Sequence, residues 1–142
     1  MCSDILISVD VEHSDNLLSG RKTVEVRRRR PRIEPGTRVW IYTKVPRAAI
    51  EAVGIVEEVH GASAGVLWKR YSAEVAISRT RLVEYLAGAS SSCAIKFSSI
   101  TPLQRSIGLD EIRQAVGAFQ PPQFFKRLRS SEKELLLLRG QT

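Results

Sequence analysis

The side chains best suited to chemistry lie in one short stretch, Gly20 to Arg30. Here Lys22, Glu25 and Arg27 bring two cations close to one carboxylate. A lysine in this setting can bind phosphate as a point charge. It can also act as a base or nucleophile if burial and neighbouring cations lower its pKa. Because Glu25 favours the protonated amine, the residues favour a charged, binding Lys22. Glu25 itself could orient the two cations, act as general base for a water, or simply pair with Arg27.

Positive charge is concentrated around this stretch. From Arg21 to Arg47 there are ten Lys or Arg residues against two acids, a local net charge of +8, while the whole chain carries +7. Such clustering predicts a polyanionic partner, with nucleic acid ahead of an anionic membrane. The arginines at 28, 29, 30 and 32 are predicted to form a rim that contacts phosphates, or else a charged loop without a ligand.

A strand must position this charged group. Val24 and Val26 alternate with polar residues, which is the period of a half-buried strand. The valines should therefore face the core, with Glu25 and Arg27 about 7 Å apart on the other face. Lys22 lies at an odd separation from Glu25, so it reaches the same site only if a turn after Gly20 carries it there.

The remaining patterns predict an α+β fold, in which a small curved sheet or barrel is flanked by short helices. The length of 142 residues suits one domain, 1–142. Capping-box spacing of Ser131 and Glu134 predicts a last helix within about 130–139. Strands are expected at 5–9, 23–27, 37–43, 48–60 and 92–100, and helices at 13–19, 64–71, 78–86 and 109–116.

No metal or cofactor is expected from the residue pattern. Cys2 and Cys93 have no metal-ligand spacing, and His13 and His60 are predicted to be surface residues. No apolar run reaches the roughly 18 residues of a membrane span, and no signal peptide is recognised. We expect a cytoplasmic protein with reduced thiols. The apolar run Leu135–Leu138 predicts a core or docking helix, which offers a contact for a protein partner.

Other candidate ligand contacts lie outside the charged stretch. Tyr42 and Lys44 end a predicted strand, where Tyr42 could stack on a base or position a scissile phosphate, or could instead be covered by a helix. Lys96 alternates with apolar residues, so it is expected to be exposed or to face the cleft. Gln123 follows two prolines that restrict the backbone, which suits an amide that reads a base edge or caps local backbone groups.

The order of these motifs resembles the ASCH domain family of the PUA-like superfamily of small β-barrels. The resemblance covers roughly 4–128 and has its most specific part in the Gly-x-Lys-x-x-Glu-x-Arg element from Gly20 to Arg27. It is supported by Gly36-x-Arg38-Val39-Trp40-Ile41-Tyr42, by Ala52-Val53-Gly54-x-Val56, by Ala94-Ile95-Lys96-Phe97 and by Pro121-Pro122-Gln123-Phe124-Phe125.

The resemblance implies that Lys22, Glu25 and Arg27 lie in a cleft beside the barrel. It also implies RNA binding for many members, and for some bacterial members hydrolysis of N4-acetylcytidine or of RNA. In the acetylcytidine amidohydrolases a threonine stands where this chain has Glu25, and the nearest threonine here is Thr23. That departure weakens the transfer of this particular chemistry.

Two functional hypotheses follow. The first is binding of RNA, or of single-stranded nucleic acid, in a basic cleft. Its candidate contacts are Arg21, Lys22, Arg27, Arg28, Arg29, Arg30, Tyr42, Lys44, Lys96 and Gln123. The alternative is a small hydrolase of modified nucleosides, or a metal-independent ribonuclease, that uses Lys22, Glu25 and Tyr42.

Overall fold

The computed structural model describes residues 4–141, so Cys2 lies outside the described residues. Short helices and strands follow one another along the described chain. In order they are β1 (Ile5–Val9), α1 (Val11–Leu18), β2 (Val24–Arg27), β3 (Arg38–Thr43), β4 (Ala49–Gly61), α2 (Ala64–Tyr71), α3 (Arg79–Leu86), β5 (Cys93–Gly108), α4 (Leu109–Val116), β6 (Lys126–Arg127) and α5 (Ser130–Arg139). The strands β2, β3 and β4 are consecutive, and α2 is followed directly by α3. Within this part of the chain, no helix has the length and apolar character needed to cross a membrane.

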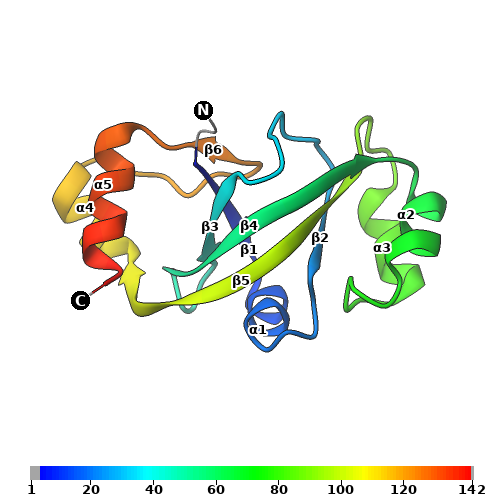
Figure 1. Ribbon diagram of the computed structural model, residues 1–142, viewed down its shortest axis with the longest axis horizontal. Helices are drawn as coiled ribbons and strands as arrows, with labels where there is room; N and C mark the ends of the chain where they lie inside the picture. The colour runs from blue at the N-terminus through cyan, green and yellow to red at the C-terminus, as the bar shows by residue number, and fades with distance from the viewer. Residues whose placement is uncertain (1–3, 142) are drawn as a thin grey trace.

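The strands form one mixed sheet in the order β2-β5-β4-β3-β1-β6. The pair β1–β3 is parallel, and the other neighbouring pairs are antiparallel. The long strands β4 and β5 lie side by side across the molecule, as Figure 1 shows. Shifts in their register bend the sheet. One shift lies next to Gly54, where an added Cβ would come within 2.6 Å of the Phe97 ring. The sheet therefore curls into part of a barrel.

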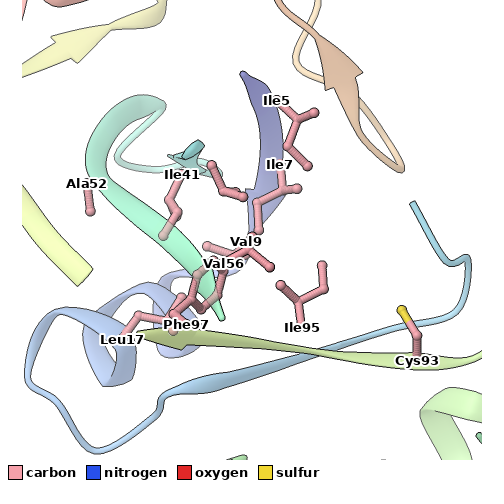
Figure 2. Packing of buried hydrophobic residues seen from close by; sticks show 11 residues of the cluster. Ile5, Ile7, Val9, Leu17, Ile41, Ala52, Val56, Cys93, Ile95 and Phe97 are labelled. Carbon is pink, nitrogen blue, oxygen red and sulfur yellow. The ribbon is translucent and has the colours of Figure 1, made fainter. Parts of the chain in front are cut away.

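An apolar cluster fills the concave side of the curled sheet, as shown in Figure 2. Ile7 and Val9 of β1 meet Ile95 and Phe97 of β5 there, and Leu17 of α1 packs against them. Inward-facing residues alternate with outward-facing ones along each strand, as the pleat requires. This cluster fixes β1 against β5 and α1.

Two further clusters cover the outside of the sheet. On one side Leu6, Trp40 and Ile107 pack against Ile112 of α4 and Leu136 of α5. On the other side the valines of β2 pack against α2 and α3. That cluster contains Val24, Val26, Leu67, Tyr71, Val75, Leu82, Leu86 and Ala94. The predicted α+β class with a curved, barrel-like sheet is confirmed, and so is burial of the β2 valines.

Two expectations about elements need correction. β5 continues to Gly108 instead of ending near Ile100, because its polar second half pairs with β4 although several of its side chains are exposed. The last helix begins at Ser130, and its N-cap is Arg129, two residues before the Ser131 cap that the spacing of Ser131 and Glu134 predicted. The carboxylate of Glu132 accepts a hydrogen bond from the backbone N–H of Arg129 at 2.9 Å.

Candidate functional site

A pocket lies at the seam between β1 and β2, where the curled sheet is not closed by backbone pairing. We call it the seam pocket, and its volume is about 200 Å³. The end of β1, the first turn of α1, β2, the end of β3 and one face of α3 surround it. Its lining residues are Ser8, Val9, Asp10, His13, Lys22, Glu25, Val26, Arg27, Lys44, Ile77, Arg81 and Tyr85.

The predicted Lys22–Glu25–Arg27 group forms one connected ion cluster in this pocket. The Lys22 Nζ lies 3.5 Å from Glu25 Oε1, and Arg27 Nη1 lies 3.1 Å from Glu25 Oε2. Lys22 is 1% exposed and Glu25 is 4% exposed. Lys22 also donates a 2.6 Å hydrogen bond to the carbonyl of Val75. Glu25 therefore holds two cations at once, on the face of β2 opposite the buried valines.

The turn after Gly20 brings Lys22 to the same side as Glu25. Gly20 has a φ of +83°, a left-handed conformation that favours glycine. The chain then folds back so that the backbone N–H of Lys22 donates to the carbonyl of Asn16 at 3.0 Å. Because this turn breaks the strand alternation, the odd separation of Lys22 and Glu25 does not place them on opposite faces.

Burial and charge act in opposite directions on the two buried groups. Burial lowers the pKa of Lys22 from its ordinary value, while the carboxylate of Glu25 partly restores it. Burial alone would raise the pKa of Glu25, but the charges of Lys22 and Arg27 outweigh it and hold that pKa below the ordinary range. The ionised Glu25 lies 3.5 Å from the Lys22 amine and favours its charged form, so we assign Lys22 as protonated.

Arg27 ties the two sides of the seam together. Its Nη1 donates to the Ser8 carbonyl of β1 at 3.1 Å as well as to Glu25, and its Nη2 donates to the Phe124 carbonyl at 2.8 Å. β6 pairs only with Ile5 and Leu6, so the second half of β1 has a free edge at this point. A side chain on β2 thus replaces the backbone ladder that would close the barrel.

Known proteins were compared with this sequence and fold. No family model matches the chain. A protein of Zymomonas mobilis named ASCH domain-containing ribonuclease is 31% identical over 134 residues, which span 94% of this chain and 90% of that protein. The chain belongs to the ASCH domain family.

Solved structures support the family assignment. The crystal structure of the Zymomonas mobilis ASCH protein has a TM-score of 0.89 at 31% identity, covering 96% of this chain and 94% of that one. A protein of Rhodopseudomonas palustris solved by NMR has a TM-score of 0.60 at 13% identity, covering 97% and 92% of the two chains. The second likeness, at low identity, concerns the fold alone.

Tyr42 does not line the seam pocket of this ASCH domain. It is 3% exposed and packs with Trp40 in the outer cluster beneath α4 and α5. The side chains of the next two residues, Thr43 and Lys44, lie in other surroundings. Thr43 is buried beside Ser14 of α1, and its Oγ1 lies 2.7 Å from the Ser14 Oγ. Lys44 lies at the pocket rim, 3.5 Å from Asp10. The alternative in which a helix covers Tyr42 is therefore the one observed.

His13 is a pocket residue that the sequence reasoning placed on the surface. Its ring lines the seam pocket, and its Nδ1 is buried without a hydrogen-bond partner among the described residues. The hydroxyl of Ser8, also in the lining, is in the same condition. Burial lowers the pKa of His13, and the charge of Glu25 opposes that shift only in part. A neutral imidazole therefore adjoins the Lys22–Glu25 pair.

The segment at α3 supplies the other lining residues that the sequence did not predict. Arg81 and Tyr85 lie four residues apart on one side of α3, and Ile77 lies just before the N-cap Ser78 of that helix. The spacing of Arg81 and Tyr85 can be recognised in the sequence, but the sequence does not show that this face of α3 packs beside β2. Arg81 also makes two hydrogen bonds to Glu12 of α1, at 3.1 and 2.6 Å, and so connects the helices on either side of the pocket.

Several other predicted contacts lie outside the seam pocket. Lys96 is 3.5 Å from Glu57 and 3.4 Å from Glu74, so its charge is paired with acids. Gln123 has an exposed side chain, and its carbonyl is 3.5 Å from Arg27 Nη2. Arg21 is exposed on the turn that carries Lys22. No group of three or more potential metal ligands occurs within residues 4–141.

Proposed function

We propose that this ASCH domain binds RNA, or another single-stranded nucleic acid, with one part of a nucleotide in the seam pocket. The observation that carries the proposal is the pocket's charge. Its lining has four cations (Lys22, Arg27, Lys44 and Arg81) against the two carboxylates Asp10 and Glu25. The arginine tract continues directly from one wall.

The size of the pocket limits what can enter it. A volume of about 200 Å³ lies below the ~300 Å³ at which whole small-molecule sites begin. A base or a phosphate fits this space better than a whole nucleotide, whose remainder would lie along the rim. Two buried polar atoms of the lining, the Ser8 hydroxyl and His13 Nδ1, have no partner within residues 4–141 and are available to such a group.

A salt titration tests RNA binding. We expect the affinity for a labelled single-stranded oligoribonucleotide to fall linearly on a log–log plot against salt, because phosphate contacts release counterions. Duplex DNA in the same assay distinguishes the partner class. A flat salt dependence, or no binding at low salt, would reject the proposal.

A second candidate is metal-independent RNA cleavage. It is favoured by the similarity to the Zymomonas mobilis protein that is named a ribonuclease. Cleavage by a neighbouring 2′-hydroxyl needs one group to accept its proton, one to protonate the leaving 5′-oxygen and a cation near the phosphate. Glu25, Lys22 and the neutral His13 stand together in the pocket, whereas Tyr42 is on the outer face.

Turnover assays separate this candidate from binding alone. The protein would be incubated with RNA and with N4-acetylcytidine, beside Lys22→Ala and Glu25→Gln variants whose folding is checked by circular dichroism. We expect cleavage of RNA that both substitutions abolish without loss of the folded signal. Cleavage that survives in folded Lys22→Ala protein would reject the mechanism, and conversion of acetylcytidine alone would indicate the amidohydrolase activity.

A further inference from the structure

The four consecutive arginines that leave the seam pocket are used in different ways. Arg27 closes the seam, as described above. Arg28 Nη1 donates to the carbonyls of Tyr85 and Ala87 at 2.6 and 2.9 Å, which satisfies groups at the C-terminal end of α3. The Arg29 guanidinium lies 5.0 Å from the centre of the Phe124 ring. These three side chains therefore have structural partners.

The side chain of Arg30 has weaker contacts than those of Arg27, Arg28 and Arg29. Its Nη2 lies 3.5 Å from the Val59 carbonyl, at the long limit of a hydrogen bond. Its backbone N–H donates to Ser91 Oγ at 3.4 Å. Among residues 4–141 no carboxylate forms an ion pair with it. The charge of Arg30 is therefore available to a ligand.

Arg30 lines a second cavity, of about 390 Å³, which we call the serine pocket. It lies where the end of β4 meets the start of β5, near α2 and α3 at the right of Figure 1. The other lining residues come from two short segments, Gly61–Ser63 and Ala89–Ser92. None of the lining residues is acidic.

Two serine hydroxyls of this pocket, those of Ser63 and Ser91, still have a hydrogen that they can donate to a ligand. Ser63 Oγ and Ser91 Oγ act as acceptors, from the N–H groups of Val66 and Arg30 at 3.4 Å each. Ser92 differs, because its Oγ donates to the Ala62 carbonyl at 2.6 Å. A guanidinium with nearby hydroxyl donors and no acid is the donor set that suits a phosphate oxygen.

Gly61 keeps the Arg30 side chain at this position. A Cβ at Gly61 would stand 2.8 Å from Arg30 Nη1, so any larger residue there must displace the guanidinium. The bare glycine on β4 thus forms the surface on which Arg30 lies.

We propose that the serine pocket binds a backbone phosphate of the same RNA strand that enters the seam pocket. This inference rests on the proposed RNA binding and adds to it a second contact with its own residues. Arg27 and Arg30 are three residues apart, hence at most about 10 Å along the backbone. A stacked strand advances about 3.4 Å along its axis per nucleotide, so a strand of a few nucleotides spans this backbone separation.

Oligonucleotide length and a matched arginine variant test the proposal. Binding of an RNA hexanucleotide and of a nucleoside monophosphate would be measured for the wild type, Arg30→Ala and Arg32→Ala. Arg32 is exposed in the same tract, and its substitution removes the same charge. We expect Arg30→Ala to weaken hexanucleotide binding about tenfold, to leave the monophosphate unchanged and to reduce the salt slope by about 0.7. Arg32→Ala should have a clearly smaller effect.

Gly61→Ala provides a variant without a change of charge. It should weaken hexanucleotide binding in the same direction as Arg30→Ala, with thermal unfolding confirming that the protein is folded. Equal losses for Arg30→Ala and Arg32→Ala would overturn the proposal, because they would reflect only the general field of the tract. Equal loss of monophosphate binding would overturn it too. If the wild type binds no RNA, the proposed function fails along with this contact. Hexanucleotide binding unaffected by Arg30→Ala rejects the serine pocket alone.

Discussion

Lys22 carries its charge almost entirely out of contact with water, because its side chain is buried at the wall of the seam pocket. Removing one member of a buried ion pair leaves the other uncompensated, which costs about 3–5 kcal/mol in proteins generally. Here Arg27 would still contact Glu25 at 3.1 Å, so the loss should be limited. The stability of this region and its ligand chemistry therefore depend on the same side chains.

Replacing Lys22 with methionine should lower the free energy of unfolding by about 3 kcal/mol, the lower end of that range. Equilibrium unfolding in urea measures this change. The matched control is Arg21→Met, the exposed neighbour, which should stay within about 0.5 kcal/mol of the wild type. Equal losses in the two variants would contradict the assigned burial of the ion pair.

Glu25 should make stability depend on pH. Its pKa is held below the ordinary 4.5 in the folded protein, so the unfolded chain takes up the proton first as pH falls. The stabilising contribution is present above about pH 4.5 and is lost as pH falls through the folded pKa. Other carboxylates with lowered pKa values, such as Glu58 and Glu132, would be unchanged in a variant that alters Glu25 alone, so they would affect its pH dependence and that of the wild type equally.

Glu25→Gln should therefore be less stable than the wild type at neutral pH, and its stability should decline less steeply in acid. Urea unfolding at a series of pH values gives both curves. Parallel curves down to about pH 3 would mean that Glu25 is not held ionised by its neighbours.

At the scale of elements, α5 is part of the hydrophobic packing of the domain, whether or not it also contacts a partner. Leu136 is 2% exposed and packs against the outer face of the sheet, whereas Leu138 is 71% exposed. If α5 were only a docking helix, truncation after Arg129 would spare nucleic-acid binding and abolish only a protein contact. The packing of Leu136 now indicates that such a truncation also uncovers the cluster around Trp40.

Leu136→Ala should destabilise the protein by about 2–5 kcal/mol, the range for truncating a buried leucine. Leu138→Ala is the control, since it makes the same chemical change in the same helix, and it should change stability by less than about 0.5 kcal/mol. Thermal and urea unfolding compare the two. If Leu136→Ala left the free energy of unfolding unchanged, α5 would not be part of the folded core.

At the scale of the whole molecule, closure of the curled sheet depends on Arg27. Its fork reaches Glu25, the Ser8 carbonyl and the Phe124 carbonyl, which belong to three separate segments. Lysine keeps the charge but offers no planar fork. A change of one residue on β2 should therefore loosen the seam without altering net charge.

Arg27→Lys should cost about 1–3 kcal/mol, because a lysine ammonium cannot bind Glu25 and the Ser8 and Phe124 carbonyls together. Hydrogen exchange should accelerate first in β2 and around Phe124. Arg32→Lys, at an exposed position, is the control and should leave exchange unchanged. Uniform acceleration over the whole sheet would argue against a local role at the seam.

The sequence by itself determined the elements and the charged group of the site. Local alternation and caps were enough to predict most strands and helices, and the β2 alternation was enough to place Glu25 and Arg27 on one face. For Lys22 the prediction depended on an assumed turn after Gly20 and on the family resemblance. The reason is that these features depend on neighbours within a few residues. The directions of Tyr42 and His13 were not predictable in this way, because each depends on which distant element covers it.

Only the tertiary structure placed α3 over β2, which added Arg81 and Tyr85 to the pocket and left the His13 Nδ1 without a partner. It also divided the arginine tract, which looked uniform in sequence, into three side chains with structural partners and one, Arg30, that faces a separate cavity. Charge can be counted from composition, but whether a charge is free to bind depends on the carbonyls, rings and acids that folding places beside it.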